Sequence, residues 1–285
     1  MKAAEINIRD PFVLCDGGIY YLYGTRAENF GKKTGGFDVY VSHDLEQFSP
    51  PRECFDSERF GLNRDVNWAP EVHKYKGCYY MFATFTMENG LKGTHALCAD
   101  NPLGPFVPHS RTALTPKDCE CLDGTLYISK NNQPYLIYCH EHMQIIDGSV
   151  CFIKLSDDLS RGISAPVKLF HGSEPYFIDK KAEGEHYVTD GPYTYRTKTD
   201  ELLLIWSTFV NEKYTECVAR SDNREIDGRF LHLPLIVEND GGHGMIFKAG
   251  DRLMLTYHTP NRSGFERPVF KELVDKGSTV ELKQP

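Results

Sequence analysis

The sequence has no long apolar run and no concentration of basic residues. No stretch approaches the roughly 18 consecutive apolar residues that a membrane-spanning helix needs, so we expect no membrane partner. Lys and Arg number 32 against 40 Asp and Glu, which gives a net charge of −8 and no basic stripe for binding nucleic acid. The first residues, MKAAEINIRDPF, lack the apolar core of a signal peptide. We therefore expect a cytoplasmic protein, unless a leader has been removed.

The cysteines form no recognisable framework. There are nine, an odd number, and most lie within apolar segments, as buried reduced thiols do. The only close pair, Cys119 and Cys121, lacks the spacing of zinc ligands and has no second pair to complete a site. The cysteines thus predict neither disulfides nor a zinc centre.

One pattern is repeated five times along the chain. A polar or small residue opens an apolar strand, a tight turn follows, and an aromatic-rich strand returns. The copies are residues 9–25, 68–84, 121–140, 189–208 and 242–259. A third strand with small and polar residues follows most copies. The unit is therefore a β-meander, and no amphipathic helix of ordinary length interrupts the series.

Five meanders with almost no helix predict an all-β fold, a five-bladed β-propeller formed by residues 1–285 as a single domain. A β-sandwich is the alternative, but it would not explain why the same two-stranded sequence pattern is repeated five times. We also expect the N-terminal segment 3–8 to pair beside residues 267–274, so that both ends of the chain complete one blade.

In a propeller the first strand of each blade lines the central channel, so the residues that open the five copies meet on one face. These openers are Asp10, residues 68–71, Asp123, Asp190 and His243. Two carboxyl groups across a pocket are the equipment of glycoside hydrolysis, in which one protonates the leaving oxygen and the other activates water or attacks the sugar. A third carboxylate nearby raises the pKa of the acid by repulsion between like charges.

Other residues near the openers are candidates for contacts with an oligosaccharide substrate. Aromatic side chains offer apolar faces to a sugar ring, and the candidates are Trp68, Phe12, Tyr193 and Trp206. Packing within a blade is an equal alternative for Trp68. Glu71 is a candidate supporting residue, and Arg267 a candidate ligand of a sugar hydroxyl or carboxylate, with an ordinary surface ion pair as its alternative.

The motifs RDPF (9–12), WAPEV (68–72), DGP (190–192) and GGHG (241–244), with the opener Asp123, resemble glycoside hydrolase family 43 over residues 7–272. Members are five-bladed propellers that hydrolyse α-L-arabinofuranosides, β-xylosides and some galactosides with inversion. The resemblance implies that Asp10 is the general base and that Asp123 modulates the pKa of the acid. It also implies a structural calcium ion or a water near His243, and no cofactor for the chemistry itself.

The sequence departs from this family at the general acid. Members usually have Glu-Gly-Pro where this chain has Asp190-Gly191-Pro192, and Asp is one methylene shorter. Either Asp190 acts as the acid, or Glu141 in YCHEH (138–142) replaces it. If residues 140–142 continue the strand, His140 and His142 share one face and Glu141 lies on the other, which places the histidines outside the pocket of Glu141.

We therefore expect an inverting glycosidase that acts in exo mode on α-L-arabinofuranosides or related β-xylosides. A galactosidase or galactofuranosidase of the same fold is one alternative, since the changed acid suggests an altered specificity. A propeller that binds sugars without catalysis is the alternative from another class, although Asp10 and Asp123 are both present. The sequence leaves the oligomeric state open.

Overall fold

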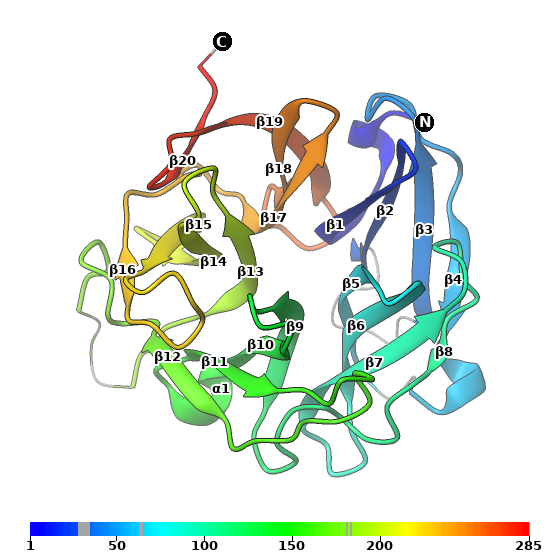
Figure 1. Ribbon diagram of the computed structural model, residues 1–285, viewed down its shortest axis with the longest axis horizontal. Coiled ribbons are helices and arrows are strands. Elements are labelled where there is room, and N and C mark those ends of the chain that lie inside the picture. Colours follow the sequence, from blue (N-terminus) through cyan, green and yellow to red (C-terminus); the bar gives the residue numbers. More distant parts are fainter. Residues whose placement is uncertain (28–34, 63–64, 181, 183, 285) are drawn as a thin grey trace.

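The computed structural model describes residues 1–27, 35–62, 65–180, 182 and 184–284. In these residues the strands form five antiparallel sheets of four, which stand around a central axis (Figure 1). The predicted five-bladed β-propeller is confirmed. The helices of the described residues are too short or too polar to cross a membrane.

Each blade is built from four consecutive strands, which are numbered from the centre outward in all five blades. Blade 1 contains β1 (Ile8–Asp16), β2 (Ile19–Arg26), β3 (Gly36–Ser42) and β4 (Arg52–Asp56). Blade 2 contains β5 (Asn67–Tyr75), β6 (Cys78–Thr86), β7 (Lys92–Ala99) and β8 (Val107–Pro108). Blade 3 contains β9 (Cys121–Ile128), β10 (Pro134–His140), β11 (Ser149–Lys154) and β12 (Val167–His171). Blade 4 contains β13 (Asp190–Arg196), β14 (Leu202–Val210), β15 (Lys213–Ser221) and β16 (Phe230–His232). Blade 5 contains β17 (Gly242–Ala249), β18 (Arg252–Thr259), β19 (Arg267–Asp275) and β20 (Val280–Leu282).

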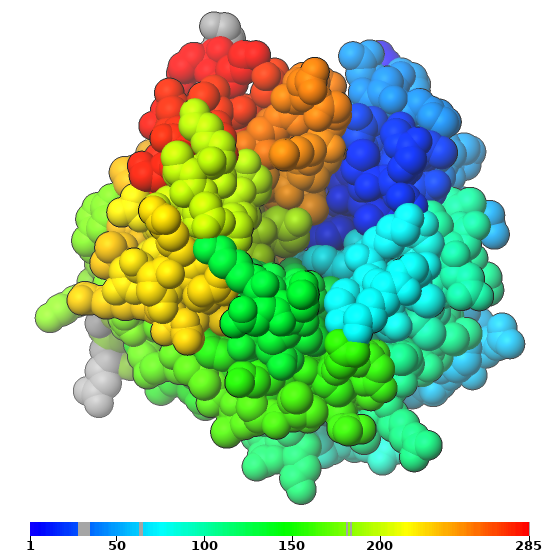
Figure 2. All heavy atoms as spheres, viewed as in Figure 1, coloured from blue at the N-terminus to red at the C-terminus, as the bar shows by residue number. Residues whose placement is uncertain are grey.

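The described helices are short. They are the 3-10 helices η1 (Ala3–Glu5) and η3 (Glu58–Phe60) and the α-helix α1 (His142–Ile145). The blades follow one another around the molecule in sequence order, and the first and last blades lie side by side (Figure 2). Large apolar side chains fill the spaces between neighbouring blades, so the core is a ring of clusters around the channel.

The expectation that both chain ends share a blade is wrong. Residues Ala3–Glu5 form η1, and the last blade takes all four strands from the C-terminal part of the chain. Its outer strand is Val280–Leu282, which pairs with β19. Helix η1 packs against β19 instead of pairing with it. The short outer strand escaped sequence analysis because three residues carry no periodic pattern.

Every inner strand has a bulge close to its first residues. One residue at each bulge has a positive φ, which is uncommon outside glycine. These residues are Asp10 (54°), Ala69 (47°), Asp123 (56°), Gly191 (51°) and His243 (52°). Bulges re-aim side chains, often beside active sites. Asp10, Asp123 and His243 therefore occupy the same position in their blades, whereas Asp190 lies one residue earlier.

At four of the five bulges the amide donates to a side chain near the end of the second strand of the preceding blade. Such pairs are Ala69 N–H to Thr25 Oγ1 (2.8 Å), Asp123 N–H to Thr84 Oγ1 (2.9 Å), His243 N–H to Ser207 Oγ (2.7 Å) and Asp10 N–H to His258 Nδ1 (3.1 Å). Blade 3 has Cys139 at the corresponding place, paired with Leu122. Gly191 N–H donates instead to Asp123 Oδ2 at 3.0 Å. Hydrogen bonds thus join all five blades at one level of the channel.

Replacing Ser207 with Ala tests this ring. Ser207 is fully buried, accepts the His243 amide and donates to Glu216 Oε2 at 3.0 Å. Its loss leaves a buried amide and a buried carboxyl group each with one partner fewer, and we expect unfolding free energy to fall by about 1–3 kcal/mol. Urea unfolding measures this change. Ser278→Ala, in an exposed turn, is the control, and equal midpoints for both variants would contradict the prediction.

Candidate active site

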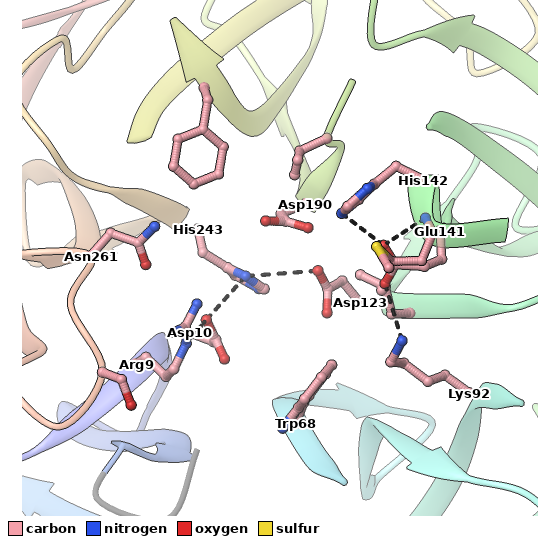
Figure 3. Close-up of a pocket in the computed structure, with 15 residues that line it drawn as sticks. Arg9, Asp10, Trp68, Lys92, Asp123, Glu141, His142, Asp190, His243 and Asn261 are labelled. Atoms are coloured by element: carbon pink, nitrogen blue, oxygen red, sulfur yellow. Dashed lines mark hydrogen bonds and ion pairs between the residues drawn. The ribbon is translucent and has the colours of Figure 1, made fainter. Parts of the chain in front are cut away.

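A cavity of about 450 Å³ lies where the inner strands begin. It brings together the four carboxyl groups that the sequence singled out, from blades 1, 3 and 4 (Figure 3). Residues that line it are Arg9, Asp10, Trp68, Lys92, Leu122, Asp123, Glu141, His142, Met143, Val188, Asp190, Phe209, His243, Asn261 and Ser263. The bulges of β1, β9 and β17 and the start of β13 supply most of the charged groups.

Asp10 is a buried carboxylate surrounded by nitrogen atoms. Its Oδ2 accepts a hydrogen bond from Thr25 Oγ1 at 2.6 Å, and its Oδ1 lies 3.2 Å from His243 Nδ1 and 3.5 Å from Arg9 Nε. Burial raises the pKa of Asp10, but His243, Arg9 and His258 together outweigh it and lower the pKa to about 2. Asp10 is therefore ionised at neutral pH.

His258 fixes the backbone of Asp10. Burial lowers the pKa of His258 to about 3, so the imidazole is neutral at neutral pH. Its Nδ1 accepts the Asp10 amide, so the ring proton belongs on Nε2. Nε2 lies 3.3 Å from Asn261 Oδ1, which suits that tautomer. A chain of hydrogen bonds thus leads from Asp10 to Asn261 at the pocket wall.

Asp123 and Asp190 have the opposite environment. Burial and the charge of Glu141 raise the pKa of Asp190 to about 7, although Tyr214 Oη donates to its Oδ2 at 3.0 Å. Burial and the nearby Asp190 raise the pKa of Asp123 well above its ordinary value, while the Gly191 amide partly offsets this. The site therefore holds a carboxyl proton near neutral pH, opposite an ionised Asp10.

Glu141 lies in the same pocket, and so does His142. The expected strand across residues 140–142 is wrong, because β10 ends at His140 and helix α1 begins at His142, with Glu141 as its N-cap. Glu141 Oε1 lies 3.0 Å from His142 Nε2, and Oε2 lies 3.3 Å from Lys92 Nζ (Figure 3). Both oxygens of Glu141 thus face nitrogen atoms.

The four aromatic candidates occupy three different places. Trp68 lines the pocket, with Lys92 Nζ 5.5 Å from its ring centroid. Phe12 and Tyr193 lie further along the channel, with ring centroids 6.0 Å apart, and line a separate cavity. Trp206 is fully buried. Of the four, only Trp68 is placed to contact a sugar beside the carboxyl groups.

Trp206 packs in the core between blades 3 and 4, where its ring centroid lies 5.1 Å from that of Phe170. Trp206 lies on β14, the second strand of blade 4, as the sequence predicts, but its side chain points between the blades. The expectation of a sugar contact at Trp206 therefore does not hold, because no part of it is exposed.

Glu71 and Arg267 do not line this pocket. Glu71 is buried, and its Oε2 lies 3.0 Å from His73 Nε2. Arg267 begins β19, the third strand of blade 5, and its Nε donates to Ala4 O at 3.0 Å. Arg267 thus anchors η1 on the outside of the propeller, so its expected contact with substrate does not hold.

His243 faces carboxylates, with Nδ1 3.2 Å from Asp10 Oδ1 and 3.8 Å from Asp123 Oδ2. Calcium takes six to eight oxygen ligands. Within the described ranges, no group of three or more His, Cys, Asp and Glu side chains could hold a metal ion. The calcium ion or water expected near His243 stays a prediction, and we assign no step to a metal.

Sequence analysis missed the groups that surround the carboxylates. They are Arg9, Lys92, His142, Tyr214 and Asn261. Arg9 could have been identified from the sequence, because it directly precedes Asp10 in the RDPF motif. In the structure its Nη1 lies 3.1 Å from the fully buried Glu266. The others come from the starts of the third strands β7 and β15, from the start of α1 and from the loop after β18, whose approach to the channel no repeat pattern indicates.

Comparison with known proteins agrees with this geometry. The family described as Glycosyl hydrolases family 43 matches residues 4–274. The chain belongs to this family. It is therefore a glycoside hydrolase, and a five-bladed propeller with carboxyl groups at one end of its channel is the form that family membership predicts. Among curated protein sequences, none matches the chain.

Solved structures of this family are similar over the whole chain. The endo-arabinase from Bacteroides thetaiotaomicron VPI-5482 is 33% identical, with a TM-score of 0.88 over 98% of this chain and 99% of that one. A thermostable family-43 glycoside hydrolase is 22% identical, with a TM-score of 0.83 over 99% and 95% of the chains. The α-L-arabinofuranosidase from Lactobacillus brevis is 16% identical, with a TM-score of 0.77 over 98% and 94%. The last two share the fold.

Proposed function

We propose that this family 43 hydrolase cleaves α-L-arabinofuranosidic bonds with inversion, using Asp10 as the base and Asp190 as the acid. The observation that carries this proposal is the contrast between an ionised Asp10 and a proton-retaining Asp190 in one pocket. Pairs of carboxyl groups with pKa values pushed apart mark acid and base roles. The arabinose unit is supported by the 33% identity to an endo-arabinase.

Asp10 accepts a proton from water as the water oxygen attacks the anomeric carbon. Its Oδ2 is engaged by Thr25, while Oδ1 accepts no hydrogen bond from the described residues and lies near nitrogen atoms of Arg9, His243 and His258. Arg9 is itself fixed by Glu266. Asp10 is thus oriented through Oδ2, while its buried Oδ1 has no hydrogen-bond donor among the described residues.

Asp190 gives its proton to the leaving oxygen as the bond to the anomeric carbon breaks. The products are a free sugar of inverted configuration and an alcohol, and solvent returns the proton from Asp10 to Asp190. Glu141 is the competing acid, but Lys92 and His142 engage both of its oxygens. We infer that Glu141 instead supports Asp190, because its charge keeps that carboxyl protonated. Asp123 orients the acid through the Gly191 amide.

The mode of attack has two candidates. Exo action is our expectation from the sequence, in which a compact domain removes terminal sugars from oligosaccharides. Endo action is favoured by the identity to an endo-arabinase over nearly the full length of both chains. Related β-xylosides and galactofuranosides remain competing substrates, and a binding protein without turnover is the contrary reading of the shortened acid.

We expect turnover of 4-nitrophenyl α-L-arabinofuranoside or of linear α-1,5-arabino-oligosaccharides, abolished in Asp10→Ala. Proton NMR of the first product reports its anomeric configuration, which should be inverted. Chromatography of early products separates the modes, because exo action releases one size and endo action releases several. Binding of these sugars without turnover by the wild type would refute catalysis, and faster turnover of xylosides or galactosides would refute the arabinose assignment.

Replacing the acid should have an effect that depends on the leaving group. Asp190→Ala should lower kcat/KM on oligosaccharides by on the order of 10²–10⁴-fold, because their leaving oxygen needs a proton. Aryl arabinosides with good leaving groups need little protonation and should lose much less. Glu141→Ala is the matched comparison, with the same truncation in the same pocket. If Glu141→Ala shows this dependence and Asp190→Ala does not, the two roles are exchanged.

The pH profile tests the support that Glu141 gives to Asp190. Since the pKa of Asp190 is raised to about 7, the acid is protonated below that pH, and kcat/KM should fall as pH rises through it. Asp10 loses its negative charge only near pH 2, so it does not set this limb. Glu141→Gln removes a charge that raises the pKa, so the alkaline limb should move to lower pH. An unmoved limb would contradict the assignment.

A further inference from the structure

A second cavity, of about 570 Å³, lies in blade 2 outside the catalytic pocket. Its walls come from residues 60–62, from the turn between β6 and β7, and from residues 111–117. Lys92, the first residue of β7, lines the catalytic pocket, so the β6–β7 hairpin contributes to both cavities. The second cavity therefore lies next to the active site, but it contains none of the carboxyl groups assigned to catalysis.

His95 is the buried polar group of this cavity. It is 8% exposed, and its ring packs edge-on against Phe85 at 5.8 Å between centroids. It forms no hydrogen bond with the described residues, and burial lowers its pKa to about 4, so the ring is neutral at neutral pH. A neutral imidazole offers one donor and one acceptor, and buried polar groups normally have partners. A ligand with hydroxyl groups would satisfy both.

The walls around His95 combine apolar and hydroxyl-bearing side chains. Phe60, Leu62 and Met87 are apolar, while hydroxyl groups come from the buried Thr86 and Thr115 and from the exposed Thr112. Binding sites for small molecules have mainly apolar walls with a few placed polar groups. A sugar ring, which has apolar faces and hydroxyl groups at its edge, matches this composition.

The rim adds positive charge. Arg111 and Lys117 are exposed and form no ion pair with the described residues, and Glu88 is the one carboxylate among the described lining residues. The rim thus has a net charge of +1 from these groups. Arg presents a planar fork of donors that fits a carboxylate. An acidic sugar would meet charges of the right sign here.

We propose that this cavity binds a sugar that carries a carboxylate, a uronic acid, with His95 at a ring hydroxyl and Arg111 and Lys117 at the carboxylate. The site goes beyond the hydrolysis of arabinosides, because no catalytic group contributes to it. It suits an acidic residue on the same glycan or a free acidic sugar, since both present the same chemistry.

The test measures binding of D-glucuronate to the whole protein by isothermal titration calorimetry, with L-arabinose as the neutral probe. We expect saturable binding of glucuronate to the wild type and a loss of about tenfold or more in Arg111→Ala/Lys117→Ala, which corresponds to about 1.4 kcal/mol. His95→Phe keeps a ring against Phe85 and should also weaken binding. Lys154→Ala, an exposed cation on β11, is the control and should bind as the wild type does.

Asp10→Ala separates the two cavities. Glucuronate affinity should be unchanged in this variant, whereas turnover of the aryl arabinoside should be unchanged in Arg111→Ala/Lys117→Ala. Absence of saturable glucuronate binding, or equal affinity in the double variant, would overturn the site, and equal affinity for arabinose would overturn the acidic sugar. Loss of glucuronate binding in Asp10→Ala would assign it to the catalytic pocket. Failure of arabinoside turnover alone would affect only the proposed function.

Discussion

The active site depends on the bulge at the start of each inner strand. Five residues there adopt a positive φ, and hydrogen bonds from the neighbouring blade fix each amide. A bulge shifts which side chains point into the channel, so it turns Asp10, Asp123 and His243 toward the axis from three separate blades. Because one blade holds the amide of the next, the geometry of the carboxyl groups is coupled to closure of the whole ring. A propeller that opened between two blades would lose the site before it lost its sheets.

Burial of several carboxyl groups in one cavity is unfavourable unless each is neutralised. The protein uses two solutions within a single pocket. Asp10 remains charged because Arg9 and His243 lie against it, whereas burial and the charges of neighbouring carboxylates raise the pKa of both Asp123 and Asp190. The asymmetry between blades 1 and 4, rather than the identity of any carboxyl group, separates the proposed base Asp10 from the proposed acid Asp190. Arg9 precedes the bulge in blade 1, and Asp190 occupies that same place in blade 4.

The repeat made the fold predictable, and with it the meeting of Asp10, Asp123, Asp190 and Glu141 in one cavity. Errors arose where a side chain's direction depends on local backbone. Trp206 lies near the end of a second strand, where the repeat predicts residues close to the pocket, yet its side chain points between two blades. Glu141 follows a strand that ends at His140 and does not continue to residue 142, and the turn of α1 brings His142 to Glu141. Periodicity of two residues predicts a face only while the strand continues.

Gly191, the neighbour of the proposed acid Asp190, sets how closely the inner strand of blade 4 approaches the axis. This glycine has φ of 51°, and a Cβ there would lie 2.7 Å from Cδ2 and 2.8 Å from Cγ of His243. Only glycine allows the start of β13 to approach the ring of His243 so closely. Its amide meets Asp123 Oδ2, where the other blades use a side chain from a second strand. The backbone of blade 4 is thus drawn toward the carboxyl groups of the axis. From this backbone Asp190, whose side chain is one methylene shorter than that of glutamate, lines the pocket.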